Sequence, residues 1–466
     1  MKKILYFLLA LSFTIMLAAC TESASEEEET MVQDETFSFP ASEPSDVEWT
    51  CAHDFHEGRA WIDFSCDQKH YSGAIDKTGT MIFRVERNTD DPVTVTDYSN
   101  GYAFIMHQDK VDVVDLNGTI VSTQLLNDTT SLSAYGDGYT LIEEHRADFD
   151  SSKYVYTIYS PQGDSLKTIE TEAPSNFTSY LGKGVFLCNG SMYFLNSGAQ
   201  IPFEENGGNI YFYEDVAPLG IRYTDADKDG YRGVLSLVDS NGQTSDIELY
   251  PEYGWNWDDD ILAVKGDKTI LYSYSGIETL TTYNLEDGTF VSMPENHTQK
   301  VVWEDIVSPL FFDVSGKIAL TMRGSDENYY VALFDSTWNM TTEPIQIRSN
   351  QNFVRGYGYA DSGYVLSEGR FIVSNIGISE DPKTYIYDEN GNLIYELYEK
   401  GFYGISPYSD GAACVSSWEN HKRTGYSVNL VTPGLMSLGN DESPQYLDLE
   451  GNLLFEKINL SNVLDI

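Results

Sequence analysis

The sequence predicts an all-β fold, a β-propeller of antiparallel four-stranded blades. Long helical patterns are scarce, whereas short runs of β-branched and aromatic residues alternate with Gly, Asn, Asp and Ser. A turn signal also recurs at steps of 35 to 60 residues, which matches propeller blades and exceeds the repeat of leucine-rich proteins. We expect seven to nine blades, with eight as the best estimate, in a single domain spanning residues 47–466.

The first repeated signal is a glycine after a polar residue, followed by small or apolar residues that alternate along a strand. Such a pair places a tight turn directly before a strand, because glycine accepts the backbone conformations that tight turns need. The pairs are Glu57-Gly58, Asn100-Gly101, Asp137-Gly138, Lys183-Gly184, Ser362-Gly363 and Asp410-Gly411.

The second repeated signal is an apolar strand that ends in a tight turn and is followed by another β-rich stretch. Asp or Ser opens the turn by bonding its own backbone, and Gly supplies the positive φ that reverses the chain. The turn glycines are Gly79, Gly118, Gly163, Gly198, Gly242, Gly288, Gly391 and Gly451, with a degenerate equivalent near Asn339. Some of these hairpins, such as the one at residues 313–316, are alternatively insertions, which leaves the blade number open.

Two neighbouring motifs carry a family resemblance. The pattern F-x-E-G-x-A-x-I from Phe55 to Ile62, followed by G-x-I-D-K-T-G-x-x-I from Gly73 to Ile82, is similar to WG-repeat proteins. The Trp-Gly pair that names that family is replaced here by Ser72-Gly73. The resemblance implies a propeller-like repeat with a binding or scaffolding role, because a fold by itself does not specify chemistry.

Charge excludes two classes of function. The chain of 466 residues has 28 basic and 73 acidic side chains, for a formal net charge of −45. A surface this negative repels phosphate backbones and anionic lipid headgroups, which argues against nucleic-acid binding and polybasic membrane attachment. The hydrophobic content of 41% and the aromatic content of 13% still allow a packed core.

Residues 1–19 have the pattern of a secretory signal. Two lysines precede a short apolar stretch, and the segment ends in Leu17-Ala18-Ala19-Cys20. This ending resembles the lipobox of bacterial lipoprotein signal peptides. The resemblance implies that the signal peptide is cut before Cys20 and that Cys20 carries the lipid, palmitate included. We therefore expect a lipid-anchored protein on the cell membrane, facing the outside of the cell; an ordinary signal peptide is the alternative.

Residues 20–46 have the composition of a disordered tether. After Cys20, this segment contains nine acidic residues, no basic residue and almost no apolar periodicity. Such sequence cannot bury enough apolar surface to offset the entropy of ordering. We expect it to hold the folded part away from the membrane, and the acidic residues elsewhere to serve mainly solubility and turn formation.

One loop has the spacing of a calcium site. Asp225, Asp227 and Asp229 alternate along the chain and are followed by Gly230. Carboxylates at alternate positions before a glycine are the oxygen ligands that a hard cation requires. The twelfth position is Ser236 instead of a bidentate Glu, so a solvated hairpin tip is the alternative. Calcium is the one cofactor that the sequence suggests.

The cysteines allow several interpretations. Cys51 and Cys66 lie fifteen residues apart in an exported chain, where thiols tend to pair, so we expect a disulfide between neighbouring strands. Free thiols and a zinc site that includes nearby histidines are the alternatives. Cys188 and Cys414 lie inside apolar strands, where we expect them to be buried.

The sequence favours a binding protein over an enzyme. It contains no G-x-S-x-G elbow, H-E-x-x-H motif, P-loop or helix-opening G-x-G-x-x-G. We expect a monomeric binding module for a protein, peptide or glycan, with no nucleic-acid partner. An exported hydrolase or lyase with carboxylates in the propeller channel is the alternative, because spacing in sequence cannot exclude carboxylate pairs.

Overall fold

The structure of the protein is a computed structural model, and the residues that it describes are mainly β-strands and turns. Cys20, Asp225, Asp227 and Asp229 lie outside these residues. The described residues are 36–37, 47–88, 92–148, 151–175, 178–202, 234–238, 241–248, 260–265, 269–274, 277–284, 289–292, 311–312, 317–323, 329–347, 364–375, 383–417, 436–437, 443–461 and 463–466.

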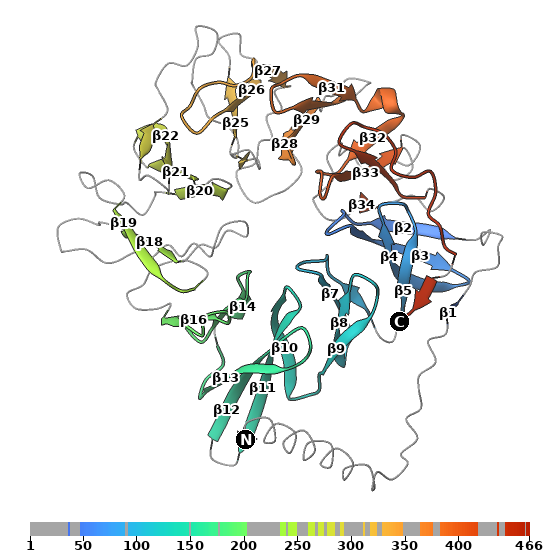
Figure 1. The fold of residues 1–466 in the computed structure, drawn as a ribbon, viewed down its shortest axis with the longest axis vertical. Helices are drawn as coiled ribbons and strands as arrows, with labels where there is room; N and C mark the ends of the chain where they lie inside the picture. Colours follow the sequence, from blue (N-terminus) through green and yellow to red (C-terminus); the bar gives the residue numbers. More distant parts are fainter. Residues whose placement is uncertain are drawn as a thin grey trace, which may run out of the picture. The chain divides into compact units, whose positions relative to one another are not determined.

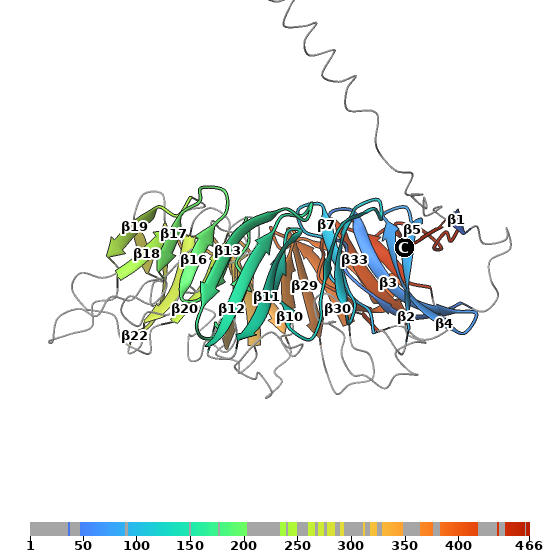
Figure 2. The ribbon, with the colours of Figure 1, turned by 90° about the horizontal axis from the view of Figure 1, so that it is seen from below.

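The described strands form nine sheets, numbered here 1 to 9 in chain order. Sheet 1 contains β2 (Glu48–Ala52), β3 (Arg59–Cys66), β4 (Lys69–Asp76) and β5 (Met81–Arg87). Sheet 2 contains β6 (Thr94–Val95), β7 (Tyr102–Met106), β8 (Lys110–Asp115) and β9 (Ile120–Leu125). Sheet 3, whose strands run side by side in Figure 2, contains β10 (Thr130–Gly136), β11 (Tyr139–Asp148), β12 (Ser151–Tyr159) and β13 (Ser165–Thr171). Sheet 4 contains β14 (Thr178–Tyr180), β15 (Val185–Cys188), β16 (Ser191–Phe194) and β17 (Gln200–Pro202).

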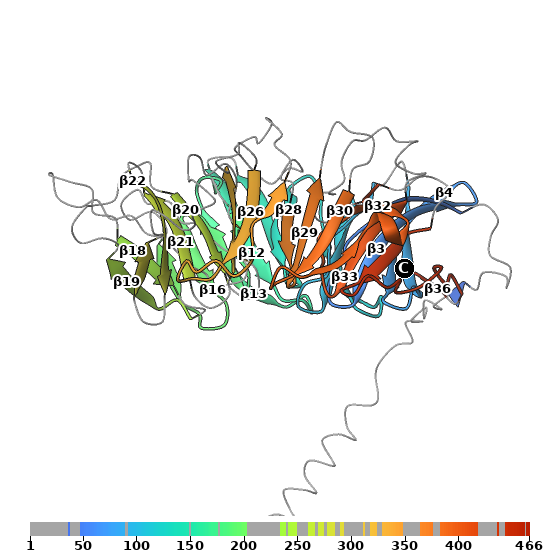
Figure 3. The same ribbon diagram turned by 90° about the horizontal axis from the view of Figure 1, so that it is seen from above.

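The later sheets repeat this pattern. Sheet 5 contains β18 (Val234–Val238) and β19 (Thr244–Glu248), and sheet 6 contains β20 (Asp260–Lys265), β21 (Thr269–Tyr274), β22 (Ile277–Asn284) and β23 (Phe290–Ser292). Sheet 7 contains β24 (Phe311–Phe312), β25 (Ile318–Arg323), β26 (Tyr329–Phe334) and β27 (Ile345–Ile347). Sheet 8, seen in Figure 3, contains β28 (Tyr364–Ser367), β29 (Arg370–Asn375), β30 (Lys383–Asp388) and β31 (Leu393–Glu396). After the short 3₁₀ helix η1 (Tyr398–Lys400), sheet 9 contains β32 (Phe402–Ile405), β33 (Ala412–Ser417) and β35 (Gln445–Asp448).

Sheet 1 gains three further strands from distant parts of the chain. β36 (Val463–Asp465) pairs in parallel with β5, and β1 (Thr36–Phe37) pairs antiparallel with β36. On the opposite edge, β34 (Met436–Ser437) pairs antiparallel with β2. β1 lies within the segment that we expected to be a disordered tether, and the compact unit accordingly begins at Thr36. Two residues of the expected tether therefore take part in the fold.

Neighbouring sheets share hydrophobic cores. In one core, Trp61 of sheet 1 stacks on Tyr98 of sheet 2 with ring centroids 6.0 Å apart. Similar clusters join sheet 3 to sheet 4, sheet 7 to sheet 8, and sheet 8 to sheet 9. Another cluster joins the last sheet to the first, and these sheets lie side by side in Figure 1. Tyr446 of sheet 9 and Phe55 beside sheet 1 are both buried in this cluster. Burying one such large side chain stabilises the fold by roughly 1.5–3 kcal/mol.

Successive antiparallel sheets whose last member packs on the first are the arrangement of a β-propeller, as the repeats predict. The nine sheets of the described residues are at the upper end of the expected range and one more than the best estimate. No helix in the described part of the chain is long and apolar enough to span a membrane.

The hairpin turns follow the predicted chemistry. In the turn that begins at Asp388, the side-chain oxygen Oδ1 accepts hydrogen bonds of 2.8 Å from the backbone N–H groups of Asn390 and Asn392. Gly391 completes the turn at a φ of 79°, a value that favours glycine. The predicted glycines in the described residues all have positive φ: Gly79, Gly118, Gly163, Gly198, Gly242, Gly391 and Gly451. Gly288 and residues 313–316 lie outside those residues.

The degenerate turn near Asn339 has the same geometry without a glycine. Asp335 Oδ1 accepts hydrogen bonds of 2.9 Å from the N–H groups of Thr337 and Asn339, and Trp338 occupies the glycine position at a φ of 64°. The Trp338 side chain is buried, and its Nε1 donates a hydrogen bond of 2.8 Å to the carbonyl oxygen of Val291 in sheet 6. Packing against the neighbouring sheet therefore offsets an unfavourable backbone conformation.

Candidate functional site

A row of tight turns connects the first and second strands of several sheets, and we call it the turn rim. At each turn, a polar residue and the glycine that follows both have positive φ, which is the type I′ geometry of two-residue hairpins. The turns in the described residues are Glu57-Gly58, Asn100-Gly101, Asp137-Gly138, Lys183-Gly184, Glu368-Gly369 and Asp410-Gly411. Glu368-Gly369 was not anticipated, and Ser362-Gly363, which was, lies outside the described residues.

Carboxylates of the turn rim connect several of these turns to the next one. Glu57 Oε2 accepts a hydrogen bond of 2.6 Å from the N–H of Gly101, which joins sheet 1 to sheet 2. Glu368 Oε2 accepts one of 2.7 Å from the N–H of Gly411, which joins sheet 8 to sheet 9. The side chain of Asp410 accepts from the N–H of Gly58 and so joins sheet 9 to sheet 1.

The turn rim continues into sheets 3 and 4 through Asp137. Its side chain accepts a hydrogen bond from the hydroxyl of Ser99 in sheet 2 and another, of 3.2 Å, from the N–H of Lys183 in sheet 4. The Tyr180 hydroxyl also donates to Asp137 Oδ2 at 2.5 Å. Burial, with a smaller effect of the Asp137 hydrogen bond, raises the pKa of Tyr180. This phenol therefore stays neutral and fixes the Asp137 carboxylate in place.

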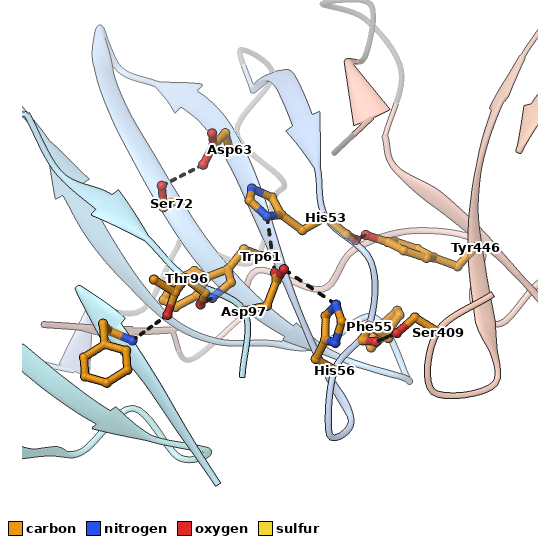
Figure 4. A network of polar contacts seen from close by, with 11 residues as sticks. His53, Phe55, His56, Trp61, Asp63, Ser72, Thr96, Asp97, Ser409 and Tyr446 are labelled. Atoms are coloured by element: carbon orange, nitrogen blue, oxygen red, sulfur yellow. Dashed lines mark hydrogen bonds and ion pairs between the residues drawn. The ribbon is translucent and has the colours of Figure 1, made fainter. Parts of the chain in front are cut away.

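A second group of polar side chains lies between sheets 1 and 2. His53 and His56, in the segment between β2 and β3, point toward Asp97, in the segment between β6 and β7 (Figure 4). His53 Nδ1 lies 3.5 Å from Asp97 Oδ1, and His56 Nε2 lies 3.6 Å from Asp97 Oδ2. Asp97 Oδ1 is buried and receives no hydrogen bond in the structure. We call these three residues the His–Asp–His cluster.

Backbone contacts hold the segment that carries Asp97. Trp61 Nε1 donates a hydrogen bond of 2.8 Å to the carbonyl oxygen of Thr96, and Thr96 Oγ1 accepts one of 3.0 Å from the N–H of Phe104 (Figure 4). Trp61 is buried, so this anchor is shielded from water. The position of Asp97 beside sheet 1 is thus fixed by its neighbour in sequence.

Sheet 9 closes the same region from the other side. The Tyr446 hydroxyl donates a hydrogen bond to the carbonyl oxygen of His53, and Ser409 Oγ donates one of 2.6 Å to the carbonyl oxygen of Phe55 (Figure 4). The rings of Phe55 and Tyr446 meet edge to face at 4.8 Å. Together these contacts form what we call the closing seam between sheets 9 and 1.

The buried groups of the closing seam are suited to structure more than to catalysis. Burial raises the pKa of the Cys414 thiol and of the Tyr446 hydroxyl well above their ordinary values. A thiol that stays protonated is a poor nucleophile. Cys188, which is also buried as the sequence predicts, has its pKa raised by burial to about 12.

The structure does not join Cys51 and Cys66 by the expected disulfide. Cys51 lies opposite Asp63 in the pairing of β2 with β3, whereas Cys66 is at the end of β3 and lies opposite Lys69 of β4. At roughly 3.3 Å per residue along a strand, their α-carbons lie beyond the roughly 7 Å that a disulfide can bridge. The two cysteines lie on neighbouring strands, as expected, but the pairing of β2 with β3 does not place them opposite each other.

The alternative of a zinc site is also corrected, because no group of three or more His, Cys, Asp or Glu in the described residues is arranged to hold a metal ion. His70 instead contacts Ser65 Oγ at 2.8 Å, and His53 and His56 face Asp97. Sequence reasoning missed Asp97 because it lies in another sheet. The only available signal was the pair of histidines next to the turn at Glu57.

Comparisons with known proteins find solved structures of low sequence identity. No family model and no curated protein matches the sequence. The chain is similar to the structure of Hsv2 from Kluyvelomyces marxianus at 12% identity, covering 65% of this chain and 96% of that one with a TM-score of 0.29. It is similar to the Pan2 WD40 domain of Neurospora crassa at 12% identity, covering 63% and 91% with a TM-score of 0.26. A Listeria monocytogenes protein described as uncharacterized matches at 12% identity, covering 77% and 96% with a TM-score of 0.31.

The β-propeller fold itself follows from the nine successive sheets of the described residues and from the packing of the last sheet on the first. The resemblance to WG-repeat proteins stays a prediction, since no family model matches.

Proposed function

We propose that the protein is an exported, lipid-anchored β-propeller lipoprotein that binds a protein, peptide or glycan through the turn rim. The observation that supports a binding surface there is the row of six turns, four of which carry an acidic residue before the glycine. Carboxylates from sheets 1, 3, 8 and 9 lie at equivalent hairpins and are held by backbone N–H groups of the next turn. Groups held in this way offer a pre-organised polar surface, which lowers the entropic cost of binding.

The proposal of a lipid anchor at Cys20 is based on the sequence. Cys20 follows Leu17-Ala18-Ala19, and the acyl chains that a lipobox cysteine carries each stabilise membrane attachment by roughly 0.8 kcal/mol per buried CH₂ group. Two or three such chains are enough for stable attachment. The acidic residues that follow would separate the propeller from the negatively charged headgroups.

Labelling and cell fractionation test the anchor. Wild-type cells fed with radioactive palmitate should yield a labelled, membrane-bound protein that added protease removes from intact cells. The variant C20A should carry no label and should be found outside the membrane fraction or as uncut precursor. Unchanged membrane retention of a correctly cut C20A chain would contradict the lipoprotein assignment.

Arrays test the binding surface. The purified chain is applied to a glycan array and to an array of tiled peptides, and the strongest signals are compared between wild type and the double variant E57Q/E368Q. The double variant should lose most of the signal, because it removes two charges from the turn rim. The control E170Q changes a carboxylate on β13 that is 57% exposed and should bind like wild type. Absence of any signal, or equal signals from E57Q/E368Q and wild type, would contradict the proposal.

We also propose that Asp225, Asp227 and Asp229 bind calcium and stiffen one blade. The proposal rests on their alternate spacing before Gly230, which suits a hard cation. Thermal unfolding with calcium and with a chelator tests it. The wild-type melting temperature should fall on chelation, and that of D225N/D227N should not change. A wild-type melting temperature that does not respond would contradict calcium binding.

A further inference from the structure

The His–Asp–His cluster bridges two sheets at a point next to the turn rim. His56 directly precedes the turn at Glu57-Gly58 in sheet 1, and His53 lies three residues before His56. Asp97 lies three residues before the turn at Asn100-Gly101 in sheet 2. These are the two turns that the Glu57 side chain joins through the N–H of Gly101. A change in the charge of the cluster therefore affects the same contact between sheets 1 and 2 that the Glu57 side chain stabilises.

Asp97 lacks a hydrogen-bond donor on one oxygen. Its Oδ1 is buried without a hydrogen bond, although His53 Nδ1 lies only 3.5 Å away. Leaving a buried carboxylate oxygen without a donor is unfavourable. A neutral imidazole carries one N–H and a protonated imidazole carries two, so protonation guarantees a donor and a positive charge on the nitrogens that face Asp97.

Most of the charged side chains around the cluster are acidic. The basic side chains nearby are engaged elsewhere: Arg59 donates to the carbonyl oxygens of Leu116 and Gly58, and Lys77 lies 3.1 Å from Asp410. The other titratable groups packed around the cluster are acidic or stay neutral; they are Asp54, Glu57, Asp410, Cys414 and Tyr446. Among the described groups around the cluster, negative charge exceeds positive charge.

We propose that the His–Asp–His cluster is an acid-strengthened clamp between sheets 1 and 2. Histidine is the side chain whose charge changes between pH 5 and pH 8. A protonated His53 would pair with Asp97 Oδ1 and a protonated His56 with Asp97 Oδ2, so that the carboxylate is held from both sides. The segments that carry them, residues 53–58 and 96–101, are then held together more firmly.

Hydrogen–deuterium exchange at pH 5.5 and pH 8.0, corrected for the intrinsic exchange rates, tests the clamp in the full chain. In wild type, protection of peptides covering residues 53–58 and 96–101 should increase on the order of fivefold at pH 5.5, the size expected for a partly buried ion pair. In H53Q/H56Q, this increase should be lost. Peptides of β11, at a distance in sheet 3, serve as an internal reference, because lowering the overall negative charge affects every sheet.

Two further variants separate the clamp from general effects. D97N keeps the shape of the side chain but removes its charge, so it should lose the pH response even if H53Q/H56Q fails to fold. H70Q changes the histidine of sheet 1 that contacts Ser65, and it should respond to pH like wild type. A D97N protein whose two segments gain the same protection at pH 5.5 as wild type would overturn the proposal.

Discussion

The Tyr446 hydroxyl donates a hydrogen bond of 2.6 Å to the carbonyl oxygen of His53, two residues separated by 393 positions in the chain. Both groups are in the closing seam, where the Tyr446 side chain is fully buried. His53 at the same time faces Asp97 of sheet 2 through its side chain. One residue of sheet 1 thus contacts both neighbouring sheets, by its backbone on one side and by its imidazole on the other.

Removing this hydroxyl should destabilise the closing seam. Tyr446→Phe leaves the partly buried carbonyl oxygen of His53 without this donor, so we expect the free energy of unfolding to fall by about 0.5–1.5 kcal/mol. Urea unfolding followed by tryptophan fluorescence measures the change. The control Tyr398→Phe alters a tyrosine that is 57% exposed and should change the stability by less than about 0.5 kcal/mol. Equal stabilities of Y446F and wild type would show that the bond contributes nothing.

The ion pair between Arg84 and Asp465 should contribute more to the free energy of unfolding than an exposed ion pair does. Arg84 Nε lies 2.5 Å from Asp465 Oδ1, the Arg84 side chain is only 5% exposed, and its guanidinium lies 4.2 Å from the centre of the Tyr71 ring. We expect Asp465→Asn to lower the free energy of unfolding by about 1–3 kcal/mol, because a charge-assisted bond to a buried cation is lost.

The matched control for this ion pair is Glu86→Gln. It breaks the pair of Glu86 with Lys69, in which both side chains are about half exposed, and should cost about 0–1 kcal/mol. Urea unfolding of the two variants side by side gives the comparison. If D465N is no less stable than E86Q, the carboxyl end does not contribute to stability through this contact.

The more exposed a cysteine is, the faster it should be alkylated. Cys51 is half-buried, whereas Cys66, Cys188 and Cys414 are buried, and burial raises the pKa of Cys188 to about 12. Because the thiolate is the reactive form, iodoacetamide at pH 8 should modify Cys51 at least about tenfold faster than the other three. Mass spectrometry of the peptides measures each site. A Cys51 that reacts only after reduction would instead indicate a disulfide.

Stability should fall in alkaline solution. Burial, against the opposing effect of a hydrogen bond from Tyr408, raises the pKa of Tyr395 to about 12 from its ordinary value of 10.0. A group whose pKa is higher in the folded state stabilises the fold fully below the unfolded pKa, and this contribution is lost as the pH rises toward the folded value. We expect the unfolding midpoint in urea to fall between pH 10 and pH 12, with phenolate absorbance rising in parallel.

The slope of this loss is at most about 1.4 kcal/mol per pH unit for each such group. In Tyr395→Phe the decline above pH 10 should be shallower than in wild type. A midpoint that stays constant up to pH 12 would show that the buried tyrosines do not control alkaline stability.

The local part of the fold could be predicted from the sequence. The turn at Asp388 depends on residues within four positions of each other, so its aspartate, asparagines and glycine predict it directly. The same reasoning extended to Asp335, although Trp338 stands where glycine was expected. The repetition of this turn along the chain predicted the propeller, because turns at regular steps imply sheets of similar size.

The contacts between sheets could not be predicted. Asp97 looks like any acidic residue in a loop, and only the packing of sheet 2 on sheet 1 brings it to His53 and His56. Cys51 and Cys66 show that the register of neighbouring strands could not be predicted either. Their strands are adjacent, as expected, and the pairing of Cys51 with Asp63 shows the register. No residue near the cysteines in the sequence indicates this register.

The strands that complete sheet 1 impose an order on folding. β2 to β5 are synthesised first, yet this sheet takes β34 and β36 from the last part of the chain. Contacts between such distant residues form late because they close long loops. The sheet that is made first is thus the last to be finished, and its exposed edges must stay protected from other strands until the carboxyl end has been synthesised.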